Sequence, residues 1–212
     1  MKPPLFDYIR EPDAIYAASF KEIRAVADLS VVPAELHPLA VRVVHACGDV
    51  GVIEDLACSP GAVEAGQRAL FWGAPVLVDV RMLAQGIIAR ALPAKNRIVC
   101  TIDDAGVVEE AKRQGITRSA KALDRWGPHL GGAVVVIGNA PTALFRLLEG
   151  LGEGWPRPAL ILGFPVGFVG ATESKDALIA HAGSVPYVTL RGRRGGSAIA
   201  AAAFNALTIG VR

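Results

Sequence analysis

The chain has 212 residues, of which 52% are hydrophobic and 20% are charged, so it can build a full buried core and does not have the composition of a disordered protein. Its 22 basic and 20 acidic residues leave a net charge of +2, a balance that does not indicate a general nucleic-acid-binding protein. No stretch reaches the roughly 18 consecutive apolar residues that a membrane span needs.

The N-terminal segment and the cysteines indicate where the protein works. Residues 1–13 carry charges and prolines where a signal peptide would have its apolar run. The three cysteines, Cys47, Cys58 and Cys100, are odd in number and form no CxxC pair. We therefore expect a cytoplasmic protein with reduced thiols and without a cysteine-based zinc site.

Three helices are predicted in the first third of the chain. Residues 11–28 have a proline in the first turn and apolar residues that recur on one face. Residues 34–49 show a second helical pattern with an apolar stripe. Ser59 is the expected N-cap of a third helix over 59–73, which ends near Gly73.

From residue 75 onward, short apolar runs alternate with helical patterns. The five predicted strands are 75–80, 97–102, 132–138, 158–164 and 185–190. The helices that follow them are predicted over 81–92, 106–126, 141–151, 172–182 and 197–209. Runs such as "AVVVIG" are apolar at every position, which is typical of strands buried on both faces. The sequence therefore predicts a single three-layer α/β domain over residues 1–212, with a mostly parallel five-stranded sheet flanked by helices.

Ligands of such sheets bind where loops leave the carboxyl ends of the strands, and two of these loops are rich in glycine. They are "GFPVGFVGATES" (163–174) and "RGRRGGS" (191–197), and each leads directly into a predicted helix. Such an approach to a helix exposes backbone N–H groups that hold anions, and the three arginines of the second loop add positive charge. The spacing is neither that of a dinucleotide-binding loop nor that of a Walker A loop, so it leaves phosphate and carboxylate equally open.

The run "RVVHACGDVG" (42–51) places one histidine among apolar residues. If residues 42–49 are helical, Arg42, His45 and Asp49 are three and four positions apart and share one face, away from the apolar stripe. Arg42 would then bind an anionic group one turn from an imidazole that titrates near neutral pH. Arg118 and Ser119 begin another predicted helix, where an arginine opposes the helix dipole and is better used by an anionic partner.

Six motifs in one order along nearly the whole chain resemble the precorrin-8X methylmutase family of corrin-ring biosynthesis. They are "AIYAASF" (14–20), "VRVVHACG" (41–48), "TRSA" (117–120), "IGNAPTALF" (137–145), "PVGFVGATESKDAL" (165–178) and "RGRRGGSAIAAAA" (191–203). The combination is much more specific than any single glycine pattern.

The resemblance implies an α/β homodimer that moves a methyl group from C11 to C12 of precorrin-8X, giving hydrogenobyrinate in cobalamin biosynthesis. It places the proton donor and acceptor on His45. It places substrate contacts on Ser19, Arg42 and Arg118, with Ser119 beside them and Tyr16 as a wall of the pocket. An intramolecular methyl shift implies no redox cofactor, metal or methyl donor. The resemblance does not distinguish metal-free precorrin-8X from its cobalt form.

Two other classes of function stay open at this point. A nucleotide- or phosphosugar-binding enzyme would use the glycine loops as phosphate cradles, with Glu173 or Lys175 as its reactive group. A non-catalytic tetrapyrrole carrier would bind the same ring without changing it. An absorbance scan with the substrate separates the three, because only a mutase converts the ring.

Overall fold

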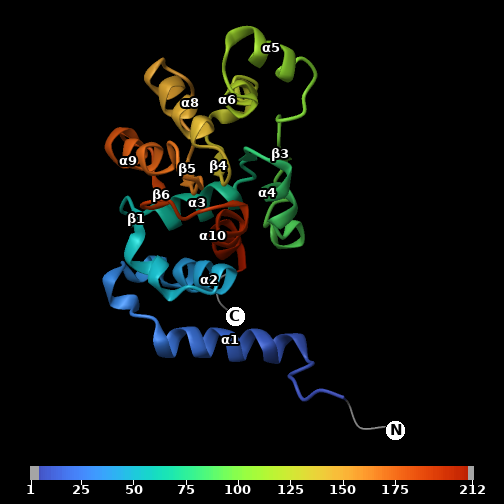
Figure 1. Cartoon of the computed structure of the whole chain (residues 1–212), viewed down its shortest axis with the longest axis vertical. Coiled ribbons are helices and arrows are strands. Elements are labelled where there is room, and N and C mark those ends of the chain that lie inside the picture. Colours follow the sequence, from blue (N-terminus) through green and yellow to red (C-terminus); the bar gives the residue numbers. More distant parts are fainter. Residues whose placement is uncertain (1–4, 210–212) are drawn as a thin grey trace.

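The computed structural model describes residues 5–209 and is organised around one six-stranded sheet (Figure 1). The strands are β1 (Leu56–Cys58), β2 (Val76–Val78), β3 (Ile98–Val99), β4 (Val134–Ile137), β5 (Leu160–Gly163) and β6 (Tyr187–Leu190). Their order is β1-β6-β5-β4-β2-β3, and every neighbouring pair is parallel except β1 with β6. Both ends of the predicted domain, residues 1–4 and 210–212, lie outside the described residues.

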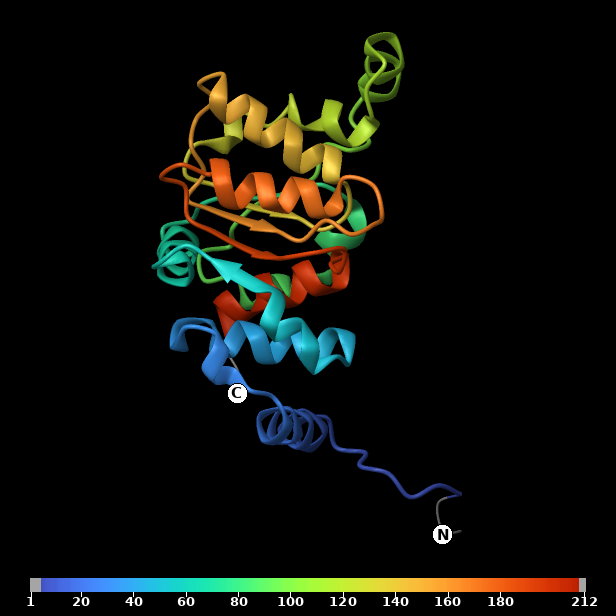
Figure 2. The same ribbon diagram turned by 60° about the vertical axis from the view of Figure 1, so that its left-hand side comes forward.

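Helices cover both faces of the sheet (Figure 2). The helices are α1 (Pro12–Val26), α2 (His37–Cys47), α3 (Ala62–Phe71), α4 (Arg81–Gly86), α5 (Val107–Gln114), α6 (Arg118–Leu123), α7 (Gly127–Leu130), α8 (Pro141–Gly152), α9 (Ala171–His181) and α10 (Ser197–Ile209). One face carries α3, α4 and α10, with α2 packed outside α10. The other face carries α6, α8 and α9. The predicted three-layer α/β architecture is confirmed.

The two core clusters follow from the alternation of side chains along the buried strands. In β4, Val134 and Val136 belong to the apolar cluster that includes Phe204 of α10. Val135, between them, belongs to the cluster that includes Leu147 of α8. Each strand of this kind must be apolar on both faces, which is why its sequence shows no alternation.

The sheet has one strand more than the five predicted. β1 runs antiparallel to β6 at the edge of the sheet, with Ala57 opposite Thr189. Of its three residues only Leu56 is buried, so β1 lacks the continuous apolar run that indicates the other strands. The prediction for Ser59 is also wrong, because α3 begins after Gly61, and the Ser59 hydroxyl accepts a hydrogen bond from the N–H of Tyr187 at 3.0 Å instead.

Two predicted helices are interrupted. The segment 81–92 leaves α-helical geometry after Gly86, because Asn205 of α10 donates to the Gly86 carbonyl at 2.9 Å and accepts from the N–H two residues later at 3.0 Å. These bonds replace those of a continued helix. The segment 106–126 divides into α5 and α6 because Gly115 takes the left-handed conformation, with φ of 66°.

The N-terminal helix α1 stands off from the layered body and packs against α2 (Figures 1 and 2). α1 buries Phe20 and Ile23 in the core cluster that also contains apolar residues of α2. The residues before α1 expose four large apolar side chains, Leu5, Phe6, Tyr8 and Ile9. Within the part of the chain described, no helix has the length and apolarity that a membrane crossing would require.

Candidate active site

His45 lies in the last turn of α2, on the side that meets α1. The helix ends at Gly48, whose left-handed φ of 68° lets its N–H bond the Val44 carbonyl at 2.7 Å. His45 is exposed, so a ligand arriving from solvent can reach it. The carbonyl end of a helix also interacts favourably with a positive charge.

A hydrogen bond from α1 fixes the orientation of the imidazole. The Oγ of Ser19 lies 2.8 Å from Nδ1 of His45. A hydroxyl donates to a neutral Nδ1 and accepts from a protonated one, so this contact survives a change in the protonation state of the ring. Because Nδ1 is occupied, Nε2 is the ring nitrogen left to exchange a proton with a ligand.

Two aromatic rings of α1 pack against the imidazole. The ring centroid of Phe20 lies 5.2 Å from that of His45 in an edge-to-face arrangement, and the centroid of Tyr16 lies 5.6 Å away. Phe20 is 2% exposed and forms the floor of the site, whereas Tyr16 is 48% exposed and can be reached by a ligand. Sequence reasoning did not assign Phe20, although its position four residues after Tyr16 places it on the same helix face.

Arg42 lies one turn before His45 on α2, as the spacing predicts. Its guanidinium carbon is 5.3 Å from the centroid of the Phe20 ring. Partial burial lowers the pKa of Arg42, an effect that Tyr16 opposes, and the group stays charged because arginine normally titrates far above neutral pH. The structure therefore gathers Tyr16, Ser19, Arg42 and His45 in one cluster, with the guanidinium one helical turn from the imidazole.

The prediction that Asp49 shares this face is wrong. Gly48 ends the helix, so Asp49 is in an extended conformation and its carboxylate accepts the N–H of Gly51 at 2.8 Å. Asp49 also forms an ion pair with Arg194. Arg194 is therefore paired with a carboxylate of its own chain, which disfavours its predicted part in binding an external anion.

Arg118 and Ser119 lie far from the His45 cluster. They begin α6, after Thr117, whose hydroxyl caps the helix at the N–H of Ala120. α6 belongs to the helical layer on one face of the sheet, whereas α1 and α2 lie beyond the other face (Figures 1 and 2). Arg118 is 3.6 Å from the carboxylate of Asp103. One chain therefore does not bring its two predicted groups of substrate contacts together.

Sequence reasoning missed the buried carboxylate that organises the carboxyl end of the sheet. Asp79 follows β2, is 1% exposed and accepts N–H bonds of 2.9–3.1 Å from Gly138, Asn139 and Ala140. Burial raises the pKa of Asp79, and the three N–H bonds oppose that shift. The carboxylate thereby fixes the loop between β4 and α8. A polar residue ending an otherwise apolar strand is the signal that could have indicated it.

The comparisons with known proteins agree with one another. The family model for precorrin-8X methylmutase matches residues 14–209. The chain belongs to the precorrin-8X methylmutase family. A precorrin-8X methylmutase from Pseudomonas aeruginosa is 61% identical, over 96% of this chain and 98% of its own length. A cobalt-precorrin-8 methylmutase from Priestia megaterium is 36% identical, over 94% of this chain and 88% of its own. The crystal structure of precorrin-8X methylmutase from Thermus thermophilus matches with a TM-score of 0.85 and 38% identity, over 92% of this chain and 94% of that one.

Membership of the precorrin-8X methylmutase family makes this chain a methyl-shifting isomerase of cobalamin biosynthesis. The family and reaction class predicted from the six motifs are confirmed. The comparisons do not favour a tetrapyrrole carrier or a nucleotide-binding enzyme. The structure adds a physical objection to the latter, because Lys175 is fully buried and donates to the Arg194 carbonyl at 2.7 Å, so it cannot act as an accessible nucleophile.

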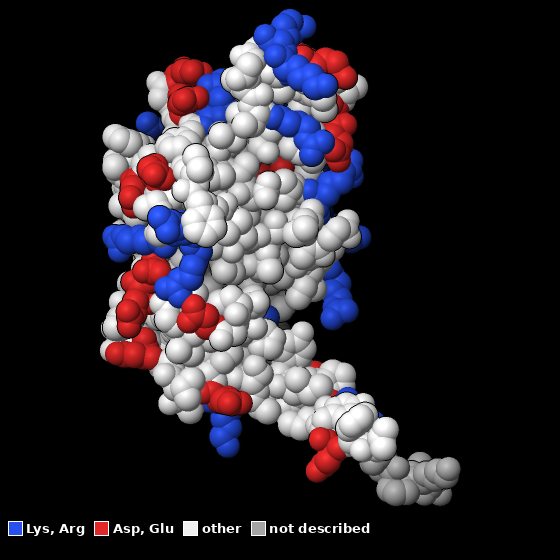
Figure 3. Space-filling model, viewed as in Figure 1, with Lys and Arg blue, Asp and Glu red and all other residues white. Residues whose placement is uncertain are grey.

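The glycine loops of this methylmutase lead into helices as predicted, with α9 beginning at Ala171 and α10 at Ser197. Charged side chains of both signs mix along the borders of one face of the molecule, whose centre is largely uncharged (Figure 3). No broad basic field covers that face, so a polyanionic ligand there would have to rely on individually placed cations and N–H groups.

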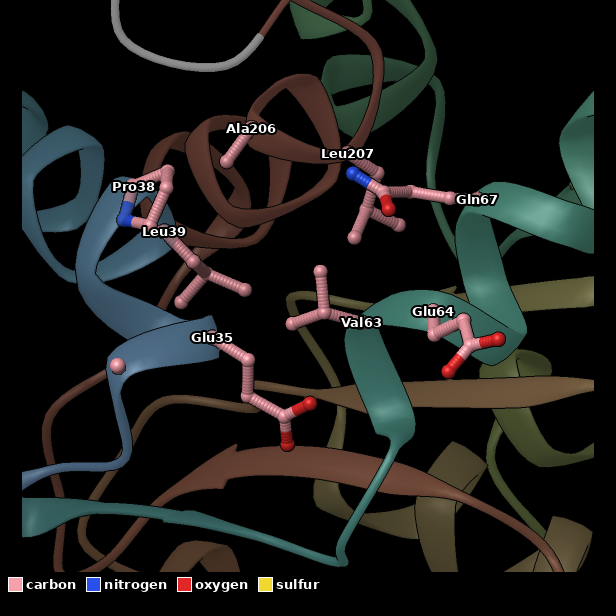
Figure 4. Close-up of a pocket in the computed structure, with 9 residues that line it drawn as sticks. Glu35, Pro38, Leu39, Val63, Glu64, Gln67, Ala206 and Leu207 are labelled. Atoms are coloured by element: carbon pink, nitrogen blue, oxygen red, sulfur yellow. The ribbon is translucent and has the colours of Figure 1, made fainter.

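Two cavities within residues 5–209 lie away from the His45 cluster. One, of about 290 Å³, lies between the start of α2, α3 and α10 and is lined by residues that include Leu39, Val63 and Glu35 (Figure 4). Another, of about 420 Å³, lies beside α4 and β3 and includes Arg81 and Cys100. Among residues 5–209, no three His, Cys, Asp or Glu side chains are grouped to hold a metal ion.

Proposed function

We propose that this methylmutase moves the methyl group from C11 to C12 of precorrin-8X, giving hydrogenobyrinate, and that His45 donates and accepts the proton. The 2.8 Å contact between Ser19 and His45 carries the proposal, because it fixes the imidazole and leaves Nε2 for the substrate. Arg42 and Tyr16 complete the cluster at the positions that the family resemblance assigns to substrate contacts.

The proposed reaction is an intramolecular methyl shift that a proton donor can assist and that requires no cofactor. The methyl group stays on the same macrocycle in a [1,5]-sigmatropic shift, so atoms and electrons balance without a redox partner, a metal or a methyl donor. A proton placed on or near a ring nitrogen draws electron density toward the carbon that receives the methyl group. Imidazole is the side chain whose charge changes near neutral pH, which suits it to this exchange.

The substrate is a flat ring with acetate and propionate side chains, and the cluster suits both features. The exposed face of Tyr16 can lie against the macrocycle. Arg42 can bind a carboxylate through paired N–H donors, a geometry that is specific as well as strong. Its cation lies one helical turn from His45, which would set the distance between a ring carboxylate and the proton donor.

We further propose a homodimer in which each site uses both chains. Arg118 and Ser119 lie across the sheet from His45, so one ring can contact both groups only if a second copy supplies one of them. The exposed apolar residues before α1, among them Phe6 and Tyr8, are the segment that we expect to contact the partner. Light scattering at micromolar concentration should then give about twice the chain mass of 22.2 kDa.

We propose that the natural substrate is the metal-free macrocycle. The greater identity to the relative named precorrin-8X methylmutase, 61% against 36% for the cobalt-precorrin-8 methylmutase, supports this choice. Incubating the purified protein with each substrate, and following the absorbance change and product mass, tests both substrate and reaction. Conversion of only the cobalt form would overturn the choice of substrate, and binding without conversion of either would overturn the reaction.

We also propose that the protein works in the cytoplasm. Cys47, Cys58 and Cys100 are free thiols in the structure, as is usual in a reducing compartment. Immunoblotting of cell fractions should find the protein with cytoplasmic markers, and recovery from a secreted fraction would contradict the proposal.

A further inference from the structure

Arg194, in the loop before α10, has three partners in the segment that follows the His45 helix. Its guanidinium forms an ion pair with Asp49 and bonds the Asp55 carboxylate at 2.5 Å. It also donates to the Gly51 carbonyl at 2.9 Å. These partners lie in and just before the 3₁₀ helix Val50–Asp55, which connects α2 to β1 and has Asp49 as its N-cap. The hydrogen bonds to Asp55 and Asp49 raise the pKa of Arg194 against the opposing effect of burial, so the charge is secure.

Hydrogen bonds from other parts of the chain fix the backbone around Arg194. The ammonium of the fully buried Lys175, on α9, donates to the Arg194 carbonyl at 2.7 Å. The N–H of Gly196 donates to the Phe164 carbonyl at 2.8 Å, which joins the two glycine-rich loops. A Cβ at Gly195 would collide with the backbone oxygens of Phe164 and Pro165, so only glycine permits this approach. Arg194 therefore projects from a rigid base.

Asp49, one of the partners of Arg194, lies close in sequence to the candidate catalytic residue His45. Asp49 follows Gly48, the residue that ends α2, and lies four positions after His45. The His45 imidazole receives its orientation from Ser19 on α1, and the chain leaves the last turn of α2 through Gly48 directly into the segment that Arg194 holds. Arg194 fixes that exit to the loops at the carboxyl end of the sheet.

We infer that Arg194 is a positioning residue for His45: by clamping Asp49, Asp55 and the Gly51 carbonyl to the glycine-rich loops, it holds the last turn of α2 where the imidazole meets the substrate. This inference rests on the proposed role of His45. It differs from a role in substrate binding, because the two carboxylates already neutralise the guanidinium.

The test replaces Arg194 with lysine, which keeps the charge but cannot reach three partners with one planar fork. We expect single-turnover conversion at saturating substrate to fall about tenfold or more, with the KM changed less than about twofold, because misplacing a catalytic group costs rate rather than affinity. Asp49→Asn, which breaks the clamp from the other side, should cause the same loss. Arg146→Lys is the matched control, since Arg146 also bridges two carboxylates, Asp124 and Glu153, in the opposite helical layer; it should leave conversion within about twofold of wild type.

Two further measurements separate this inference from a general loss of stability. Arg194→Lys should cause little further loss in a His45→Ala background, because both changes disable the same group. It should also move the imidazole NMR signals of His45 while leaving those of His181, at the end of α9, in place. An equal loss of rate in the His45→Ala background, a raised KM with unchanged rate, or unmoved His45 signals would overturn the inference. If His45→Ala is fully active but Arg194→Lys still moves the His45 signals, the proposed role of His45 fails and the clamp stands.

Discussion

Replacing the buried Lys175 with methionine should change how the stability of this protein depends on pH. Burial lowers the pKa of Lys175 from the usual 10.5 to about 8, and the charges of Asp55 and Asp176 oppose that shift. The folded protein therefore loses this proton near pH 8, whereas the unfolded chain keeps it until about pH 10.5. Because the unfolded state binds more protons at this group between these values, the contribution of Lys175 to stability rises with pH across that window.

The size of the effect follows from the two pKa values. Each pKa unit corresponds to about 1.4 kcal/mol, so the interval from about 8 to 10.5 gives at most about 3 kcal/mol. This contribution is complete above pH 10.5 and is lost as the pH falls through 8. In denaturant titrations, the free energy of unfolding of the wild type minus that of Lys175→Met should increase by up to this amount across the window.

A second lysine serves as the control. Asp124 and Glu110 raise the pKa of Lys121, so the stability that Lys121 contributes is constant below its unfolded pKa. Lys121→Met should therefore lower stability without changing the slope between pH 8 and 10.5. An identical rise with pH in Lys175→Met and in the wild type would refute the reasoning.

Three further predictions concern the site. Ser19→Ala removes the hydrogen-bond partner of His45 Nδ1, so single-turnover conversion should fall about tenfold at unchanged substrate affinity. A loss of this size corresponds to one hydrogen bond to a charged group. An unchanged rate would contradict the orienting role of Ser19. Arg42→Ala should weaken substrate binding at least about tenfold in equilibrium titrations, since a charge-assisted contact contributes about 1.5–3 kcal/mol; a substrate analogue with amidated side chains should bind as poorly to the wild type, and tight binding of that amide would contradict the clamp. An equal mixture of exchanged His45→Ala and Arg118→Ala chains should recover about a quarter of wild-type activity, because half of the dimers hold one intact site of two; no recovery after verified subunit exchange would contradict a site shared between chains.

The fold was predictable from sequence where burial dictates the pattern. β4 and β5 are buried on both faces, so their residues are apolar throughout and stand out from the helices around them. The edge strand β1 carries no such signal, because only Leu56 of its residues is buried. The hydroxyl of Ser59 could cap the following helix or bond the backbone of the neighbouring strand, and only the tertiary structure shows that it accepts the N–H of Tyr187.

The site was predictable only within one helix. The spacing of Arg42 and His45 places them on one face of α2 because helical geometry is local. The contact between Ser19 and His45 joins residues 26 positions apart and depends on how α1 packs on α2, so periodicity could not predict it. The family resemblance placed both residues in the site, but it did not predict their contact. Asp49 failed as a member of the face because Gly48 adopts a left-handed conformation that ends the helix.

The most direct test of the central claim is single-turnover conversion of saturating precorrin-8X by folded His45→Ala. We expect conversion to fall by about 10²–10⁴, the contribution of a positioned general acid, while the melting temperature and substrate binding stay close to wild type. His181→Ala, which removes an exposed histidine at the end of α9, should leave conversion unchanged. Near-wild-type conversion by folded His45→Ala would contradict the claim that His45 supplies the proton.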